Sequence, residues 1–132
     1  MAVQGKARMS NVMEDINELC QYDSEYEWFE FKENWFEVKA LGEYISALSN
    51  SAAYEGKEMA YFVWGINDDT HEVVGTHFNP NQNVNGEPLK HFLARQIFPD
   101  IDFRFDEITV EDQRVVVLSI PKAKTIPTAY AQ

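Results

Sequence analysis

The chain has 132 residues, of which 45% are hydrophobic, and this is enough for one domain with a single apolar core. Its 11 basic and 22 acidic side chains give a formal net charge of −11, which excludes a basic protein that coats nucleic acid without specificity. A lone cysteine, Cys20, excludes an internal disulfide and a zinc site built from several cysteines, and it indicates a reducing compartment.

Apolar stretches in the chain are short. The longest, residues 59–66, falls far short of the roughly 18 residues that a membrane-spanning helix needs. The basic residues near the start have no apolar segment behind them, so they do not form a signal peptide. We therefore expect a cytoplasmic protein without a membrane partner.

The first predicted element is a helix over residues 10–20, where apolar side chains at helical spacing follow Ser10, a typical N-cap residue. This helix belongs to an N-terminal extension of residues 1–21. Residues 27–32 then alternate between apolar and polar side chains, and this period of two predicts a strand.

A second helix and a buried strand follow. Asn34 and Glu37 have the spacing of a capping box, and the apolar stripe behind them predicts a helix that ends near Asn50. Residues 59–66 are apolar without alternation, as in a strand that is covered on both faces. Polar turn residues come next, and they predict that the chain folds back as a strand over residues 72–75.

The last third of the chain predicts a third helix over residues 88–98, which Pro99 ends, and then a hairpin of residues 101–110 with 114–120. Helices and strands in this order require a layered fold, because a bare sheet of this composition would expose an apolar face. We predict an α/β or α+β fold with a mixed sheet of about five to six strands covered by helices.

Three carboxylates could carry chemistry. Glu25 and Glu30 flank the first predicted strand, and Asp68 lies in the turn after the buried strand. Clustered carboxylates bind Mg²⁺ or Mn²⁺, and such an ion activates water and neutralises charge on a phosphodiester. Residues five apart in a straight strand point to opposite faces, so Glu25 would have to lie in a loop that folds back. The alternative is that they are caps and surface groups, which is the more frequent role of carboxylates in a turn or at a strand end.

Basic residues concentrate towards the C-terminal end of the chain. Residues 85–132 hold 6 basic and 7 acidic side chains, whereas residues 1–43 hold 4 and 10. We therefore expect a phosphate-facing surface to use Arg114, Lys122 and Lys124, and Lys32 to neutralise a phosphate beside the carboxylates. The alternative is that these side chains are simply solvated.

Aromatic residues concentrate between Tyr22 and Phe36. Exposed rings on a sheet can stack on unpaired bases. Because strand residues alternate, most of these rings should pack in the core, which leaves Trp28 and one or two tyrosines for stacking.

The order and spacing of several segments resemble the Schlafen AlbA-type domain. These segments are Glu25-(four residues)-Glu30-Phe31-Lys32, Ile45 to Ser51, Gly65 to Asp69 with Val73-Val74-Gly75, and Ile120-Pro121 with Pro127. The resemblance covers roughly residues 22 to 130 and implies an AlbA-like fold and a DNA-binding regulatory module, placed in bacteria at the N-terminal end of larger regulators or ATP-binding proteins. Members with ribonuclease activity have a metal-dependent site whose carboxylates map to Glu25, Glu30 and Asp68.

One segment departs from the family pattern. Members usually carry a Gly-Gly pair before the buried strand, whereas residues 52–58 here are longer and charged, without such a pair. The close backbone approach that two glycines allow is therefore lost at this point.

We therefore expect residues 1–132 to form a single domain of this type that is the N-terminal module of a longer protein. Its expected function is to bind nucleic acid, DNA or RNA, as part of a transcriptional regulator. One alternative is an endoribonuclease that depends on Mg²⁺ or Mn²⁺. A second is a protein-interaction module or homodimer that binds no nucleic acid, which the acidity of the chain favours.

Overall fold

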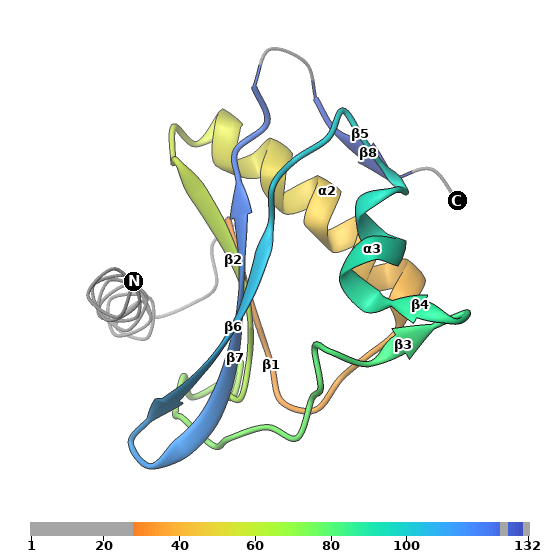
Figure 1. Cartoon of the computed structure of the whole chain (residues 1–132). Coiled ribbons are helices and arrows are strands. Elements are labelled where there is room, and N and C mark those ends of the chain that lie inside the picture. Colours follow the sequence, from red (N-terminus) through yellow and green to blue (C-terminus); the bar gives the residue numbers. More distant parts are fainter. Residues whose placement is uncertain (1–27, 125–126, 131–132) are drawn as a thin grey trace, which may run out of the picture.

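The structure is a computed structural model that describes residues 28–124 and 127–130. A mixed sheet with strand order β1-β2-β7-β6 lies at its centre (Figure 1). These strands are β1 (Phe29–Lys32), β2 (Met59–Trp64), β6 (Arg104–Val110) and β7 (Gln113–Pro121). β1 and β2 are parallel, and the other two pairs are antiparallel. The predicted class, a mixed sheet with helices, is confirmed, and its main sheet has four strands.

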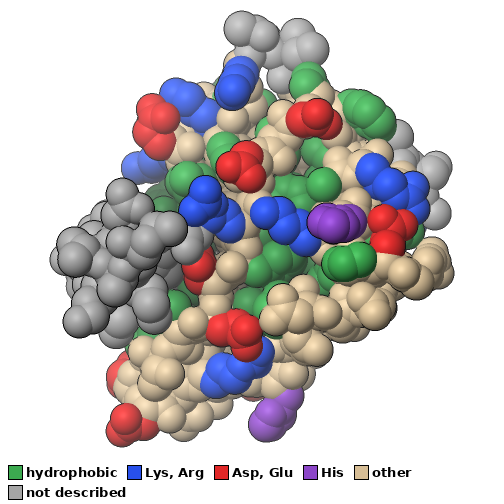
Figure 2. Space-filling view, viewed as in Figure 1, with side chains coloured by type: hydrophobic (Ala, Val, Ile, Leu, Met, Phe, Trp, Pro, Cys, Tyr) green, Lys and Arg blue, Asp and Glu red, His purple; other side chains and the backbone are tan. Residues whose placement is uncertain are grey.

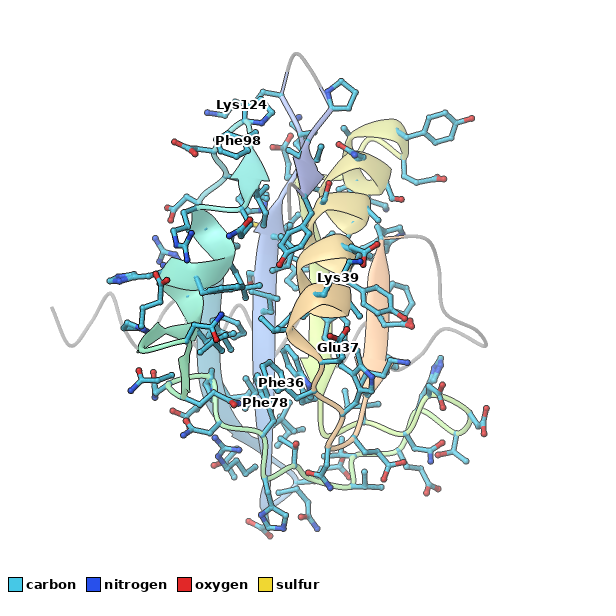
Figure 3. All side chains as sticks on the ribbon, turned by 90° about the vertical axis from the view of Figure 1, so that its right-hand side faces the viewer. Phe36, Glu37, Lys39, Phe78, Phe98 and Lys124 are labelled. Atoms are coloured by element: carbon cyan, nitrogen blue, oxygen red, sulfur yellow. The ribbon has the colours of Figure 1, made fainter. Side chains whose placement is uncertain are left out.

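Helix α2 (Val38–Tyr54) connects β1 to β2, because two parallel strands need a crossover between them. Its apolar stripe, which includes Leu41, Ile45 and Leu48, is buried as the spacing predicts. Helix α3 (Leu89–Ala94) lies beside it, and both helices cover the same face of the sheet (Figures 1 and 3).

The start of α2 differs from the prediction. Glu37 is the N-cap, and its carboxylate accepts the backbone N–H groups of Lys39 (3.2 Å) and Ala40 (2.6 Å). Asn34 lies before the helix, and its side-chain oxygen accepts the backbone N–H of His77 (2.8 Å). A contact with a distant part of the chain therefore removes Asn34 from the cap position that its local spacing favours.

The chain leaves β2 through a tight loop. Gly65 has a φ of +110°, which favours glycine, and its carbonyl accepts the N–H of Val74 (2.8 Å). The return strand expected over residues 72–75 is not formed, since a single antiparallel bridge between Ile66 and Val73 replaces it.

Two small sheets complete the fold. β3 (Asn83–Val84) pairs with β4 (Glu87–Pro88), and β5 (Ile97–Phe98) pairs with β8 (Ala129–Tyr130). The helix expected over residues 88–98 is therefore shorter than predicted. The helix ends at Ala94 because the residues that follow it form β5, which pairs with β8 near the C-terminus.

The predicted C-terminal hairpin is confirmed as β6 and β7. Glu111 and Asp112 form its turn, and both have positive φ values, 51° and 64°. A two-residue turn of this hand matches the twist of the flanking strands.

Residues 127–130, which we call the C-terminal clasp, attach to α2 by hydrogen bonds. The Thr128 N–H donates to Oδ1 of Asn50 (2.8 Å), and Nδ2 of Asn50 donates back to the Thr128 carbonyl (3.0 Å). The Thr128 hydroxyl donates to the Ser46 carbonyl (3.1 Å). The reciprocal pair fixes the clasp in one register along the helix.

Gly42 gives the clasp its close approach to α2. A Cβ atom at this position would lie 2.1 Å from Cε2 of Tyr130, so the tyrosine ring covers the helix where there is no side chain. Glycine in a helix interior costs up to about 1 kcal/mol relative to alanine. The contact with Tyr130 explains its presence.

Two features of the sequence analysis fall on the N-terminal segment. The predicted helix over residues 10–20 and the residue Glu25 lie outside the described residues. Within the described residues, no helix has both the length and the apolar character needed to cross a bilayer.

Candidate nucleic-acid interface

The carboxylates that the sequence predicts as a site are placed as follows. Glu30 lies on β1, half-buried, with Oε1 3.9 Å from Nζ of Lys32. Asp68 is exposed in the loop that follows β2. In the part of the chain that the structure describes, which does not include Glu25, no three or more His, Cys, Asp or Glu residues are grouped to hold a metal ion.

The loop that contains Asp68 is closed by its own hydrogen bonds. Oδ1 of Asn67 accepts the backbone N–H groups of Asp69 and Thr70, each at 2.9 Å. Nδ2 of Asn67 donates to the carboxylate of Glu33 (3.1 Å), at the end of the neighbouring parallel strand. We call Glu33 with residues 67–72 the acidic loop. The hydrogen bonds of Asn67 fix the backbone of this loop, and the carboxylates of Asp68 and Asp69 project from that backbone.

Lys32 points into an aromatic setting. Its Nζ lies 5.7 Å from the ring centroid of Trp35 and 5.9 Å from that of Tyr44 on α2. A cation over two ring faces is held by their quadrupoles. The ammonium group of Lys32 therefore contacts two aromatic rings and the Glu30 carboxylate, and it is only partly exposed to solvent.

Arg114, the second predicted phosphate contact, has its guanidinium in use. Nη1 donates to the carbonyls of Thr76 (3.1 Å) and Phe78 (2.7 Å), and Nη2 donates to the carboxylate of Glu107. The side chain therefore ties the segment that follows the acidic loop to strand β7.

Lys122 and Lys124 are brought together at the end of β7. Nζ of Lys122 lies 3.0 Å from a carboxylate oxygen of the exposed Glu58, an ion pair that solvent weakens. Lys124 is exposed, and no ion pair to it occurs among the described residues. Both line a hollow of about 410 Å³, whose walls are Asp100, Ile101, Asp102, Pro121, Lys122 and Lys124.

Phe98 is an exposed aromatic residue that the sequence analysis missed. Its side chain is 57% exposed, whereas Trp28, expected to be available for stacking, is 9% exposed. In Figure 3, Phe98 and Lys124 lie at the same end of the molecule. The only local signal is that Phe98 falls off the apolar stripe of the predicted third helix.

Further basic residues lie on α3 and near the start of β6. Arg95 donates to the Glu87 carboxylate, and this hydrogen bond holds the pKa of Glu87 below its ordinary value of 4.5. Lys90 lies 5.9 Å from the ring of Phe103. Figure 2 shows Lys and Arg side chains over β6 and α3, interspersed with acidic and hydrophobic groups. We use the name basic surface for five residues on or next to α3, β6 and the end of β7: Lys90, Arg95, Arg104, Lys122 and Lys124. Of these, Lys122 and Lys124 line one hollow.

Comparison with known proteins identifies the family. The sequence profile described as Schlafen, AlbA_2 matches residues 25–132, which is most of the chain. The chain belongs to this family. No curated protein matches this Schlafen AlbA_2 chain.

Two solved structures are similar to this Schlafen AlbA_2 domain. One is the DIP2311 protein from Corynebacterium diphtheriae, with a TM-score of 0.56 and 16% identity over 94% of this chain and 24% of that chain. The other is the N-terminal domain of a protein from Nitrosomonas europaea that is named as related to the ATP-dependent DNA helicase RecG. Its TM-score is 0.54, with 20% identity over 83% of this chain and 71% of that chain. At these identities the likeness concerns the fold, and this chain spans about a quarter of the length of the Corynebacterium protein.

Several residues by which the chain resembles the Schlafen AlbA family have structural roles. Ser46 and Asn50 hold the C-terminal clasp, and the Ser49 hydroxyl donates to the carbonyl of Pro121 (2.7 Å). Gly65 forms the loop after β2. Ser49 therefore fixes the end of β7, which precedes Lys122 and Lys124.

Proposed function

We propose that this Schlafen AlbA_2 domain binds nucleic acid through its basic surface, as a regulatory module of a longer protein. The observation that carries this proposal is the hollow lined by Lys122 and Lys124 at the same end of the molecule as the exposed Phe98. Lysines contact phosphates, and an exposed aromatic ring stacks on an unpaired base. Single-stranded DNA or RNA offers both groups.

The acidic groups of the hollow fit the same ligand. Asp102 lies 3.9 Å from the guanidinium of Arg104, so its charge is partly compensated. Carboxylates in such a position accept hydrogen bonds from the amino groups of bases. The similarity to a domain from a protein named as related to a DNA helicase supports this assignment as well.

The net charge of −11 sets the conditions under which binding occurs. The chain as a whole repels a polyanion, so long-range attraction does not speed the encounter. Affinity then depends on the few local lysine and arginine contacts, and we expect it to be measurable at low salt and to fall as salt rises.

The other two hypotheses have less support. A nuclease needs Glu25 beside Glu30 and Asp68. Glu25 lies outside the described residues, and within them no three His, Cys, Asp or Glu side chains are grouped to hold a metal ion. A homodimer needs a continuous apolar patch. The large exposed hydrophobic residues of the described chain are Tyr54 at the end of α2, Val74 in the loop after β2, and Phe98 in β5.

Fluorescence anisotropy with a labelled single-stranded DNA at low salt tests the proposal. Lys122→Glu/Lys124→Glu should lower affinity about tenfold or more and reduce the slope of affinity against salt, because two phosphate contacts are lost. Lys39→Glu/Lys57→Glu is the matched control: it makes the same charge change at two exposed lysines outside the basic surface. The absence of any complex with the unaltered chain, or equal losses in both variants, would refute the proposal.

A further inference from the structure

A second hollow lies near the N-terminal end of α2. Its volume is about 450 Å³, and its walls are Asn34, Phe36, His77, Phe78, Asn79 and Gln82. This size is within the range of sites that bind small molecules, roughly 300 to 1,000 Å³. None of these side chains is a carboxylate, an ammonium or a guanidinium group. The chemistry of the walls therefore suits a neutral ligand that makes hydrogen bonds, and it suits neither a phosphate nor a metal ion.

One wall of this hollow is an aromatic column. The rings of Phe36 and Phe78 lie 5.6 Å apart, side by side in Figure 3. Behind them Phe78 stacks on the buried Trp64 at 4.0 Å, with only 9° between the ring planes. The Trp64 indole N–H donates to the Trp35 carbonyl (2.7 Å). Phe36 is therefore a ring at the edge of a fixed stack, and it presents a surface on which a planar ligand can lie.

The polar wall is held in place by contacts with distant residues. The side-chain oxygen of Asn34 accepts hydrogen bonds from the His77 N–H (2.8 Å) and the Thr76 hydroxyl (3.1 Å). Arg114 fixes the carbonyls of Thr76 and Phe78 on the other side of the same segment. A site whose walls are ordered before the ligand arrives loses less entropy on binding.

Hydrogen-bonding groups remain free at this wall. Within the described residues, no partner is present for Nδ2 of Asn34, Nδ2 of Asn79, Oε1 of Gln82 or the imidazole of His77. Amide side chains recognise bases by presenting a donor and an acceptor side by side, as asparagine and glutamine do with adenine. Here the free donors, Nδ2 of Asn34 and of Asn79, and the free acceptor, Oε1 of Gln82, come from different side chains around one aromatic edge.

We infer that this hollow binds one unpaired nucleobase of a strand that the basic surface holds by its phosphates. The inference rests on the proposed function and assigns a separate subsite to it. The base stacks on Phe36, and its edge makes hydrogen bonds with the amides of Asn79 and Gln82 and with the imidazole of His77. A neutral, planar ligand with donors and acceptors on its edge matches each wall.

The test compares two strands with the same number of phosphates: an oligodeoxyadenylate and an abasic strand. Both are measured by competition in fluorescence anisotropy at low salt. We expect the abasic strand to bind about fivefold more weakly or worse, because it offers no base to Phe36 or to the exposed Phe98. A variant of the hollow's own side chains separates these two contributions. His77→Ala/Gln82→Ala should weaken binding of the oligodeoxyadenylate by a similar factor and leave binding of the abasic strand unchanged. Asn81→Ala, which removes an exposed amide of the same segment that does not line the hollow, is the matched control.

The outcomes separate the subsite from the proposed function. Equal binding of both strands, or equal effects of His77→Ala/Gln82→Ala on both, would leave phosphate binding intact and overturn the subsite. Failure of both strands to bind would overturn the subsite and the proposed function together. His77 is exposed, and Gln82 is half-buried and its side chain donates one hydrogen bond, to the Asn79 carbonyl. Thermal unfolding of the variant should therefore stay close to that of the unaltered chain and show that the fold is retained.

Discussion

The acidic loop and the basic surface are both rich in charge, but the fold uses them differently. In the acidic loop, Asn67 accepts two backbone N–H groups and reaches Glu33, so its polar groups serve the turn itself. On the basic surface, Lys122 and Lys124 line one hollow, where Lys122 pairs with the exposed carboxylate of Glu58 and Lys124 has no ion pair among the described residues. The net charge of −11 is a property of the whole chain and does not give the local charge of either region. What the domain can bind depends on how the charged side chains are distributed over its elements.

The two regions also differ in what positions them. The acidic loop is closed mainly by hydrogen bonds between residues close in sequence, whereas the segment beside Lys124 is anchored by the C-terminal clasp, 78 positions away from its partner on α2. Disturbing the clasp should consequently affect the basic surface and leave the acidic loop unchanged.

The largest effect on stability is expected from Asn50→Asp. The substitution replaces the donor Nδ2 with an oxygen that faces the Thr128 carbonyl, and an unsatisfied buried polar group costs about 1–3 kcal/mol. We expect the free energy of unfolding in urea to fall by that amount and nucleic-acid affinity to fall with it. The matched variant in the acidic loop is Asn67→Asp. It keeps the acceptor that serves two N–H groups and loses a donor to the Glu33 carboxylate. Because that contact is exposed to solvent, the substitution should cost less than half as much.

A smaller effect with a distinctive sign is expected at Gly42. Alanine gains up to about 1 kcal/mol of helix propensity over glycine, but its Cβ clashes with Tyr130, and overpacking of this kind costs about 1–3 kcal/mol. Gly42→Ala should therefore destabilise the unaltered chain and stabilise the Tyr130→Ala variant. Chemical denaturation of the four proteins in this cycle measures the change of sign. The same sign in both backgrounds would contradict the packing of Tyr130 on α2.

Neutralising the acidic loop should have little effect on binding. Asp68→Asn/Asp69→Asn removes two negative charges that lie in the exposed loop after β2, and exposed charges are screened beyond about 8 Å at physiological ionic strength. We expect affinity for single-stranded DNA to change by less than about twofold in such a buffer. A gain as large as the loss in Lys122→Glu/Lys124→Glu would show that net charge, and not its location, governs binding.

The smallest effect concerns alkaline pH. Partial burial raises the pKa of Tyr130 above its ordinary value of 10.0, and the carboxylates of Glu37 and Glu43 act in the same direction. The folded chain therefore disfavours the phenolate, so this contribution to stability is complete below pH 10 and is lost as the pH rises through the folded-state pKa. Thermal unfolding should show a decline above pH 10 that is weaker in Tyr130→Phe. An identical decline in both proteins would assign it to other groups.

Local patterns in the sequence predicted the elements that hydrophobic periodicity defines. The stripe of Leu41, Ile45 and Leu48 and the unbroken apolar run of β2 are buried as expected. The errors occur where distant residues intervene. Asn34 accepts a hydrogen bond from the His77 N–H and does not cap the helix, and the third helix is shortened by the pairing of β5 with β8.

The candidate site was less predictable for the same reason. Arg114 was expected to face phosphate because it is basic, but the carbonyls of Thr76 and Phe78, more than 30 positions away, hold its guanidinium. Phe98 was assigned to the end of a helix, and its exposure follows from strand pairing that no local pattern indicates. Lys122 and Lys124 were predicted from composition alone, and the structure places both at one hollow.

The aromatic column behind the second hollow gives the domain an intrinsic optical reporter. Trp64 is fully buried, is hydrogen-bonded through its indole N–H, and lies one ring away from Phe36 through Phe78. A ligand that lies against Phe36 changes the environment of this stack, so the ultraviolet emission of the indole should respond to occupancy without an attached dye. Ligand titrations can therefore be followed with the unlabelled domain.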